Sequence, residues 1–119
     1  MKITFAQEMQ LCKALLAAQG MPAEDAEILG SSVAHSDFTG IYSHGLSRFA
    51  NYLKRFANGA MKPDAALTIT NDTGATVAYD CDNGCGVVSL THVYRQMAPR
   101  AKEHGIVIAT GRKASNIGC

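Results

Sequence analysis

An imidazole and a guanidinium stand four residues apart in the segment 43–52, at His44 and Arg48. We expect a helix here, with Ser43 as its N-cap and His44 as its first residue, because a serine hydroxyl can accept from a free N–H of the first turn. Residues four apart share one helix face. His44 could then move a proton near neutral pH, and Arg48 could hold a carboxylate through two parallel hydrogen bonds. The segment predicts a site for a small oxyacid, although the same spacing also occurs on solvated helix surfaces.

The remaining residues of this helix are expected to divide into a polar face and a core-packing face. The polar face continues through Asn51, Tyr52 and Arg55. The opposite face repeats apolar residues at three- and four-residue steps, which is typical of a helix that packs on a core: Leu46, Phe49, Ala50, Leu53, Phe56 and Ala57.

Composition narrows the class of protein. The chain has 119 residues, 47% hydrophobic and 18% charged, with a formal net charge of +1. This length suits about one domain, and the neutral balance gives no basic field for nucleic acid. No apolar run approaches the roughly 18 residues of a membrane span. The N-terminus has no apolar signal-peptide run, and the four cysteines form no framework, so we expect a cytoplasmic chain with reduced thiols.

Three helices are expected in the first half of the chain. Thr4 and Gln7 match a capping box, and Pro22 suits the first turn of a second helix. Glycine or Asn-Gly follows each expected end, which is typical of helix termination; the ranges are about 5–19, 22–39 and 44–58. Cys12 is expected in the core, and His35 at an exposed helix end.

The second half predicts an α/β arrangement. Segments 66–70 and 75–79 alternate like strands around the turn 71–74, which indicates a hairpin. A helix containing Pro99 follows, then a short apolar strand at 106–109 of the buried parallel kind, and residues 111–119 are expected to form a loop. We therefore expect an α/β chain, with a helical segment at 1–62 and an α/β domain at 63–119.

Two further sequence patterns resemble ligand-binding motifs but lack some of the required residues. Gly84-Cys85-Gly86 lies between a strand and a helix, as a dinucleotide-binding turn would, but the third glycine is missing, so a phosphate cradle and a simple turn both remain open. Cys81, Cys85 and His92 offer three metal ligands without a second Cys-x-x-Cys. We therefore expect no metal site.

Several motifs in order resemble one family. The pattern Ser43-His44-Gly45-x-x-Arg48-x-x-x-Tyr52, with the preceding 35–40, resembles the malate/L-lactate dehydrogenase family of NAD(P)-dependent oxidoreductases. The resemblance covers the whole chain, continuing through 20–26, 73–76, 82–86 and 103–106. It implies an incomplete non-Rossmann dehydrogenase fold, consisting of an N-terminal helical segment, a β-hairpin and a strand–helix–strand unit. In such a fold, residues 1–62 would be the substrate-side segment and residues 63–119 the start of the truncated cofactor-side domain.

The resemblance also implies roles for individual residues. His44 would exchange the proton at the substrate carbonyl or hydroxyl carbon, Arg48 would hold the substrate carboxylate, and Ser43 would contact substrate. The implied reaction is hydride transfer between NAD or NADP and a small 2-hydroxy or 2-oxo acid. Members of the family usually place a histidine where this chain has Asn116, a position that could contact the cofactor.

Family members are considerably longer and are expected to be homo-oligomers, such as homodimers. The chain therefore looks like the N-terminal portion of such an enzyme, and we expect little or no activity from it alone. The alternative is a non-catalytic remnant or self-association module, because an absent half would leave apolar surface exposed.

Overall fold

The computed structural model describes residues 2–115 and 117, which form two compact units. The first unit ends at Asp64 and is helical; the second is Ala65–Ile117 and holds a sheet and a helix. The elements in chain order are α1 (Phe5–Ala18), α2 (Ala23–Phe38), the 3-10 turn η1 (Tyr42–His44), α3 (Leu46–Ala57), β1 (Thr68–Asp72), β2 (Thr76–Gly84), α4 (Gly86–His104) and β3 (Ile108–Ala114). The expected α/β class, with helices first and a hairpin and strand–helix–strand unit after them, is confirmed.

Local signals determine the ends of the helices in the first unit. The expected capping box is present, since the Thr4 hydroxyl accepts from the Gln7 N–H while the Gln7 side chain accepts from the Thr4 N–H. Gly20 takes a positive φ of 86° after α1, a conformation that glycine adopts without a Cβ penalty. Side chains of α1 and α2 form the core of this unit, including Cys12, Leu16, Leu29 and Val33. The prediction that Cys12 is a core residue is confirmed.

The buried stripe of α3 differs from the expected one. Phe49 and Phe56 are buried as expected, but Tyr52, which we expected on the polar face, is only 5% exposed. Ala50 and Ala57 are exposed instead. Positions 49, 52 and 56 follow the helical repeat, and a large aromatic ring buries more apolar area there than alanine would.

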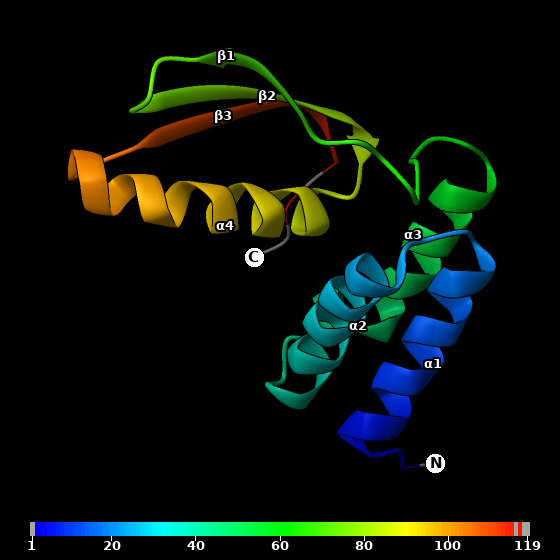
Figure 1. The fold of residues 1–119 in the computed structure, drawn as a ribbon. Coiled ribbons are helices and arrows are strands. Elements are labelled where there is room, and N and C mark those ends of the chain that lie inside the picture. The colour runs from blue at the N-terminus through cyan, green and yellow to red at the C-terminus, as the bar shows by residue number, and fades with distance from the viewer. Residues whose placement is uncertain (1, 116, 118–119) are drawn as a thin grey trace. The chain divides into compact units, whose positions relative to one another are not determined.

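The sheet has the order β1-β2-β3, with β1 antiparallel to β2 and β2 parallel to β3. Side chains of β2 alternate between buried and partly exposed, and Val77, Tyr79 and Cys81 form a core cluster with Met97 of α4. Figure 1 shows α4 running along one face of this sheet. The Tyr79 hydroxyl donates to Gln96 of the same helix at 2.9 Å. The expected hairpin and parallel pairing are confirmed.

The expectation of a buried strand at 106–109 is wrong. The strand β3 begins at Ile108 and continues to Ala114, through residues expected to form a loop, and all seven of its residues are exposed. Within the described residues β3 pairs only with β2 and is therefore an edge strand. On α4 the buried positions include Val88 and Met97, whereas Tyr94 is 70% exposed.

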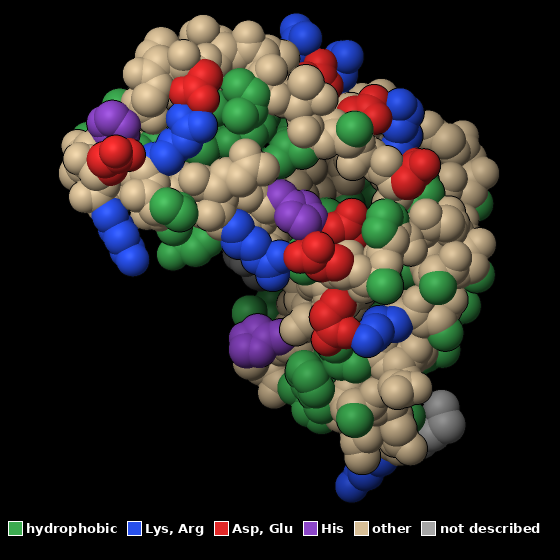
Figure 2. Space-filling view, viewed as in Figure 1, with side chains coloured by type: hydrophobic (Ala, Val, Ile, Leu, Met, Phe, Trp, Pro, Cys, Tyr) green, Lys and Arg blue, Asp and Glu red, His purple; other side chains and the backbone are tan. Residues whose placement is uncertain are grey.

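The surface of the described residues carries both charged side chains and exposed large hydrophobic ones, such as Tyr42, Tyr94 and Ile106. On the face drawn in Figure 2, side chains of both charge signs are interspersed. Across residues 2–115 and 117, none of the helices combines the length and the apolar character needed to cross a bilayer.

Candidate functional site

Ser43 and His44 lie in a tight turn before α3 rather than at its start. Both belong to η1, whereas Gly45 is the N-cap of α3. The Ser43 hydroxyl and His44 Nδ1 are 3.0 Å apart, a hydrogen-bonding distance. The expectation that Ser43 caps the helix is therefore wrong, because its hydroxyl contacts the neighbouring imidazole instead. Ser43 is exposed and His44 is half-buried.

The cap of α3 comes from a different helix. The Asp37 carboxylate of α2 accepts a hydrogen bond from the Leu46 N–H at 2.7 Å. Gly45 lies against this carboxylate, since a Cβ at that position would be 1.8 Å from Asp37 Oδ1. The first turn of α3 has no acidic residue of its own, so Asp37 brings negative charge to the positive end of the helix. Sequence reasoning missed Asp37, and the signal that could have revealed it is a glycine at the helix start with no capping side chain.

Arg48 lies in the first turn of α3 and is half-buried. Its guanidinium carbon is 6.0 Å from the centre of the Tyr52 ring, the outer range of a cation–π contact. Its Nε atom is buried and finds no hydrogen-bond acceptor among the described residues. A buried N–H without an acceptor is rare, and leaving one unpaired costs about 1–3 kcal/mol. The guanidinium therefore keeps an unused donor.

Glu8 of α1 is a second residue that sequence reasoning missed. It is 2% exposed, although glutamate is almost never fully buried unless it is paired. Burial, together with a hydrogen bond and the charge of Asp37, raises the pKa of Glu8 to about 7. Burial, together with the two carboxyl groups, also raises the pKa of the Cys12 thiol to about 12. Glu8 and Cys12 lie one turn apart on the buried face, a spacing that could have indicated the carboxyl's burial.

The predicted site residues are thus brought together only in part. Ser43 and His44 are in contact, and Arg48 follows within one turn, its N–H donating to the Gly45 carbonyl at 3.0 Å. His44 and Arg48 share no hydrogen bond in the described part of the chain. His35 is exposed near the end of α2, as expected.

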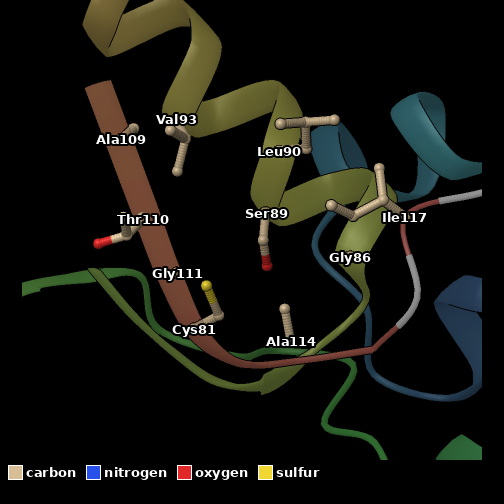
Figure 3. A pocket seen from close by; sticks show the side chains of 10 residues that line it. All are labelled: Cys81, Gly86, Ser89, Leu90, Val93, Ala109, Thr110, Gly111, Ala114 and Ile117. Carbon is tan, nitrogen blue, oxygen red and sulfur yellow. The ribbon is translucent and has the colours of Figure 1, made fainter. Parts of the chain in front are cut away.

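The second unit has a pocket between α4 and β3 (Figure 3). Its open volume is about 530 Å³, part of it continuous with solvent. Figure 3 shows the Cys81 thiol and the Ser89 hydroxyl pointing into this space. Burial raises the pKa of the Cys81 thiol, partly offset by its hydrogen bond to Ser89. The lining is mostly apolar and carries no charged side chain: Cys81, Gly86, Ser89, Leu90, Val93, Ala109, Thr110, Gly111, Ala114 and Ile117.

This pocket carries no cationic side chain that could bind the phosphates of a dinucleotide. Phosphates are bound by cationic side chains or by free N–H groups at a helix start. At the start of α4 the Gly86 N–H already donates to the Ser115 hydroxyl at 2.9 Å. Gly84 is required by packing, since a Cβ there would be 2.8 Å from the Ala65 Cβ. Asn116, the expected cofactor contact, lies outside the described residues, and no group of three or more potential metal ligands occurs within the described ranges.

Comparisons with known proteins identify relatives over the whole chain. A family model described as "Malate/L-lactate dehydrogenase" matches residues 3–119. The L-lactate dehydrogenase of Cupriavidus necator is 31% identical over 99% of this chain and 34% of its own length. The 2,3-diketo-L-gulonate reductase of Citrobacter koseri is 29% identical over 98% of this chain and 35% of its own.

A solved structure agrees with these relatives. The sulfolactate dehydrogenase of Methanocaldococcus jannaschii superimposes with a TM-score of 0.94 at 29% identity, over 99% of this chain and 34% of that one. The chain therefore spans about a third of the length of the relatives it matches.

Proposed function

The chain belongs to the malate/L-lactate dehydrogenase family of oxidoreductases, and on that premise we propose that its helical unit supplies the substrate-acid side of a dehydrogenase site. The proposed substrate is a small 2-oxo or 2-hydroxy acid. Arg48 binds its carboxylate, His44 exchanges a proton with its oxygen, and Ser43 orients the imidazole. The roles of Arg48 and His44 are carried over from the family to the matching positions of this chain. The family position of Ser43 implies a substrate contact, and its role towards the imidazole is inferred from its contact with His44 Nδ1.

The observation that carries the proposal is the unused donor of Arg48. The Nε–H is buried without an acceptor among the described residues, and Arg48 forms no ion pair in that part of the chain. A carboxylate is an acceptor-only group that binds guanidinium through two parallel bonds. An acid bound beside Arg48 would neutralise the guanidinium charge, and it would satisfy the Nε–H once the side chain turns this atom out of its buried position.

His44 is suited to the proton step. Reduction of a 2-oxo acid produces an alkoxide that needs a proton, and oxidation of the 2-hydroxy acid needs a base that removes one. The Ser43 hydroxyl at 3.0 Å from His44 Nδ1 can hold the imidazole in one orientation and leave Nε2 for the substrate oxygen. His44 and Ser43 would thus work as one proton-exchanging pair.

The hydride in this proposal comes from NAD or NADP, which supplies the two-electron chemistry when bound. The pocket between α4 and β3 carries no charged side chain, so no cofactor contact is assigned to this chain. The substrate roles of Ser43, His44 and Arg48 can be tested separately from it.

Titration of the isotopically labelled 119-residue chain with pyruvate tests acid binding. We expect amide chemical shifts to move at Ser43, His44 and Arg48, and Arg48→Gln to abolish the movement. Arg55→Gln removes a charge from the same helix and is the matched control that should still bind. Pyruvamide, which lacks the carboxylate charge, should not bind; equal shifts with pyruvamide, or binding that survives Arg48→Gln, would contradict the proposal.

A further inference from the structure

Two carboxyl groups from different helices meet inside the helical unit. Glu8 of α1 is almost fully buried, and its carboxyl lies close enough to Asp37 of α2 to share a hydrogen bond. Two ionised carboxylates repel one another, whereas one proton between them provides the donor that a hydrogen bond needs. The chemically consistent state is therefore a pair that shares one proton.

We propose that Glu8 and Asp37 are positioning residues for the acid site, and that their shared proton holds the Asp37 carboxylate against the start of α3. This inference rests on the proposed function, because it concerns the site formed by Ser43, His44 and Arg48. Neither member of the pair needs to touch the substrate. They act through the backbone that carries the side chains of His44 and Arg48.

Gly45 connects the Asp37 carboxylate to the backbone that carries His44 and Arg48. Asp37 accepts from the Leu46 N–H on one side of this glycine. The Gly45 N–H donates to the Tyr42 carbonyl of η1 at 3.3 Å, and the Gly45 carbonyl accepts from the Arg48 N–H at 3.0 Å. Displacement of Asp37 would therefore loosen both the turn that carries His44 and the helical turn that carries Arg48.

A pair in which both Glu8 and Asp37 are ionised is unfavourable inside the helical unit. Glu8 Oε1 is buried and has no hydrogen-bond partner among the described residues, so an ionised Glu8 would carry buried negative charge with one oxygen unsatisfied. Burial and the neighbouring Asp37 raise the pKa of Glu8 to about 7. Proton loss near neutral pH would then set two negative charges against one another and push Asp37 away from Leu46.

Other charged or titratable groups of the packed helices do not neutralise the two carboxyl groups in place of this proton. The Cys12 thiol of α1 interacts with both carboxyl groups but stays neutral, since its pKa is raised to about 12. Lys13 of α1 is held by Glu27 of α2 on the exposed side. No described ion pair or hydrogen bond joins the two carboxyls to a titratable or charged side chain of η1 or α3, which are Tyr42, His44, Arg48, Tyr52, Lys54 and Arg55.

The Leu46 amide reports directly on the pair, independently of any substrate. In the 119-residue chain we expect its proton and nitrogen shifts to titrate with a midpoint near the Glu8 pKa of about 7. Glu8→Gln keeps a donor towards Asp37 but cannot titrate, so the transition should disappear. Asp37→Asn keeps an acceptor for Leu46 and removes the neighbouring charge, so the midpoint should fall. Glu27→Gln is the control that leaves the titration unchanged, and circular dichroism establishes that each variant is folded.

Pyruvate affinity tests the positioning role. With a Glu8 pKa of about 7, the fraction of neutral Glu8 falls about tenfold between about pH 6 and about pH 8, and the apparent affinity should weaken by up to the same factor. In Glu8→Gln this part of the pH dependence should vanish.

The outcomes separate the two proposals. A Leu46 amide that does not titrate, or equal pH dependence of pyruvate binding in the wild type and Glu8→Gln, would overturn the positioning role while leaving acid binding by Arg48 in place. Absence of pyruvate binding at both pH values, with a normal Leu46 titration, would instead overturn the proposed function and the substrate-positioning role with it.

Discussion

The buried carboxyl of Glu8 makes the stability of the helical unit depend on pH in an unusual direction. Its pKa is raised from 4.5 to about 7 in the folded chain. Below pH 4.5 Glu8 is protonated in both the folded and the unfolded chain, so its contribution to stability is fully present. As pH rises, the unfolded chain releases this proton first, and stability falls until the pH passes the folded pKa of about 7.

The size of this effect follows from the two pKa values. Each pKa unit corresponds to about 1.4 kcal/mol, so a shift from 4.5 to about 7 changes the free energy of unfolding by roughly 3 kcal/mol. Glu8 is 2% exposed, so solvent screens this interaction little. The pKa of Cys12 is raised to about 12 and that of Asp72 is lowered to about 2, so both titrate outside this window.

Urea unfolding at a series of pH values measures the effect. Amide signals of Leu16 and Val33 report on the helical unit, and the wild-type chain is compared with Glu8→Gln at each pH. We expect the difference in unfolding free energy between the two chains to change by roughly 3 kcal/mol from pH 4.5 to about 7, with the wild type losing stability as pH rises. A difference that stays constant over this range would refute the assignment of a buried, shared proton to Glu8.

Three further predictions concern other parts of the structure. Gly45→Ala should destabilise the helical unit by about 2–4 kcal/mol in urea unfolding, because the new Cβ would be 1.8 Å from Asp37 Oδ1 and would displace the cap of α3; stability equal to the wild type would contradict the observed contact. Arg100→Gln should raise the pKa of Asp72 from about 2 towards its usual value, because Arg100 now holds that carboxylate through two bonds of 2.7 Å; carbon NMR of the Asp72 carboxyl measures this, and an unchanged pKa would exclude Arg100 as the cause. Leu29→Ala should lower the unfolding free energy by about 2–5 kcal/mol, because Leu29 is fully buried and truncation leaves a cavity; a loss below about 1 kcal/mol would show that the site collapses or is not packed as described.

Structural features that depend only on a few neighbouring residues could be predicted from the sequence. The capping box of Thr4 and Gln7, and the positive φ at Gly20, depend on local hydrogen bonds and backbone sterics. The hairpin before Thr76 follows from the turn residues in the same way. These signals located the helices, the strand pairing and the family motifs.

Features that depend on distant partners could not be predicted in this way. The cap of α3 comes from Asp37, nine residues before the N–H that it accepts from, so a local reading assigned it to Ser43. Burial of Glu8 and Tyr52 depends on which helices pack around them, and exposure of β3 depends on which neighbours pair with or cover it. Hydrophobic patterning identifies apolar residues but does not name the surfaces that cover them.

A turnover assay tests the central claim, that His44 exchanges the substrate proton in a dehydrogenase reaction. The chain's residues 3–119 replace the aligned third of the M. jannaschii sulfolactate dehydrogenase, and nicotinamide absorbance follows reduction of 2-oxo acids by NADH or NADPH. We expect the chimera to turn over substrate. His44→Ala should slow this turnover by about 10²–10⁴-fold, the usual contribution of general acid catalysis, whereas Arg55→Gln should leave the rate unchanged. An active chimera in which His44→Ala leaves both the rate and its pH profile unchanged would contradict the account.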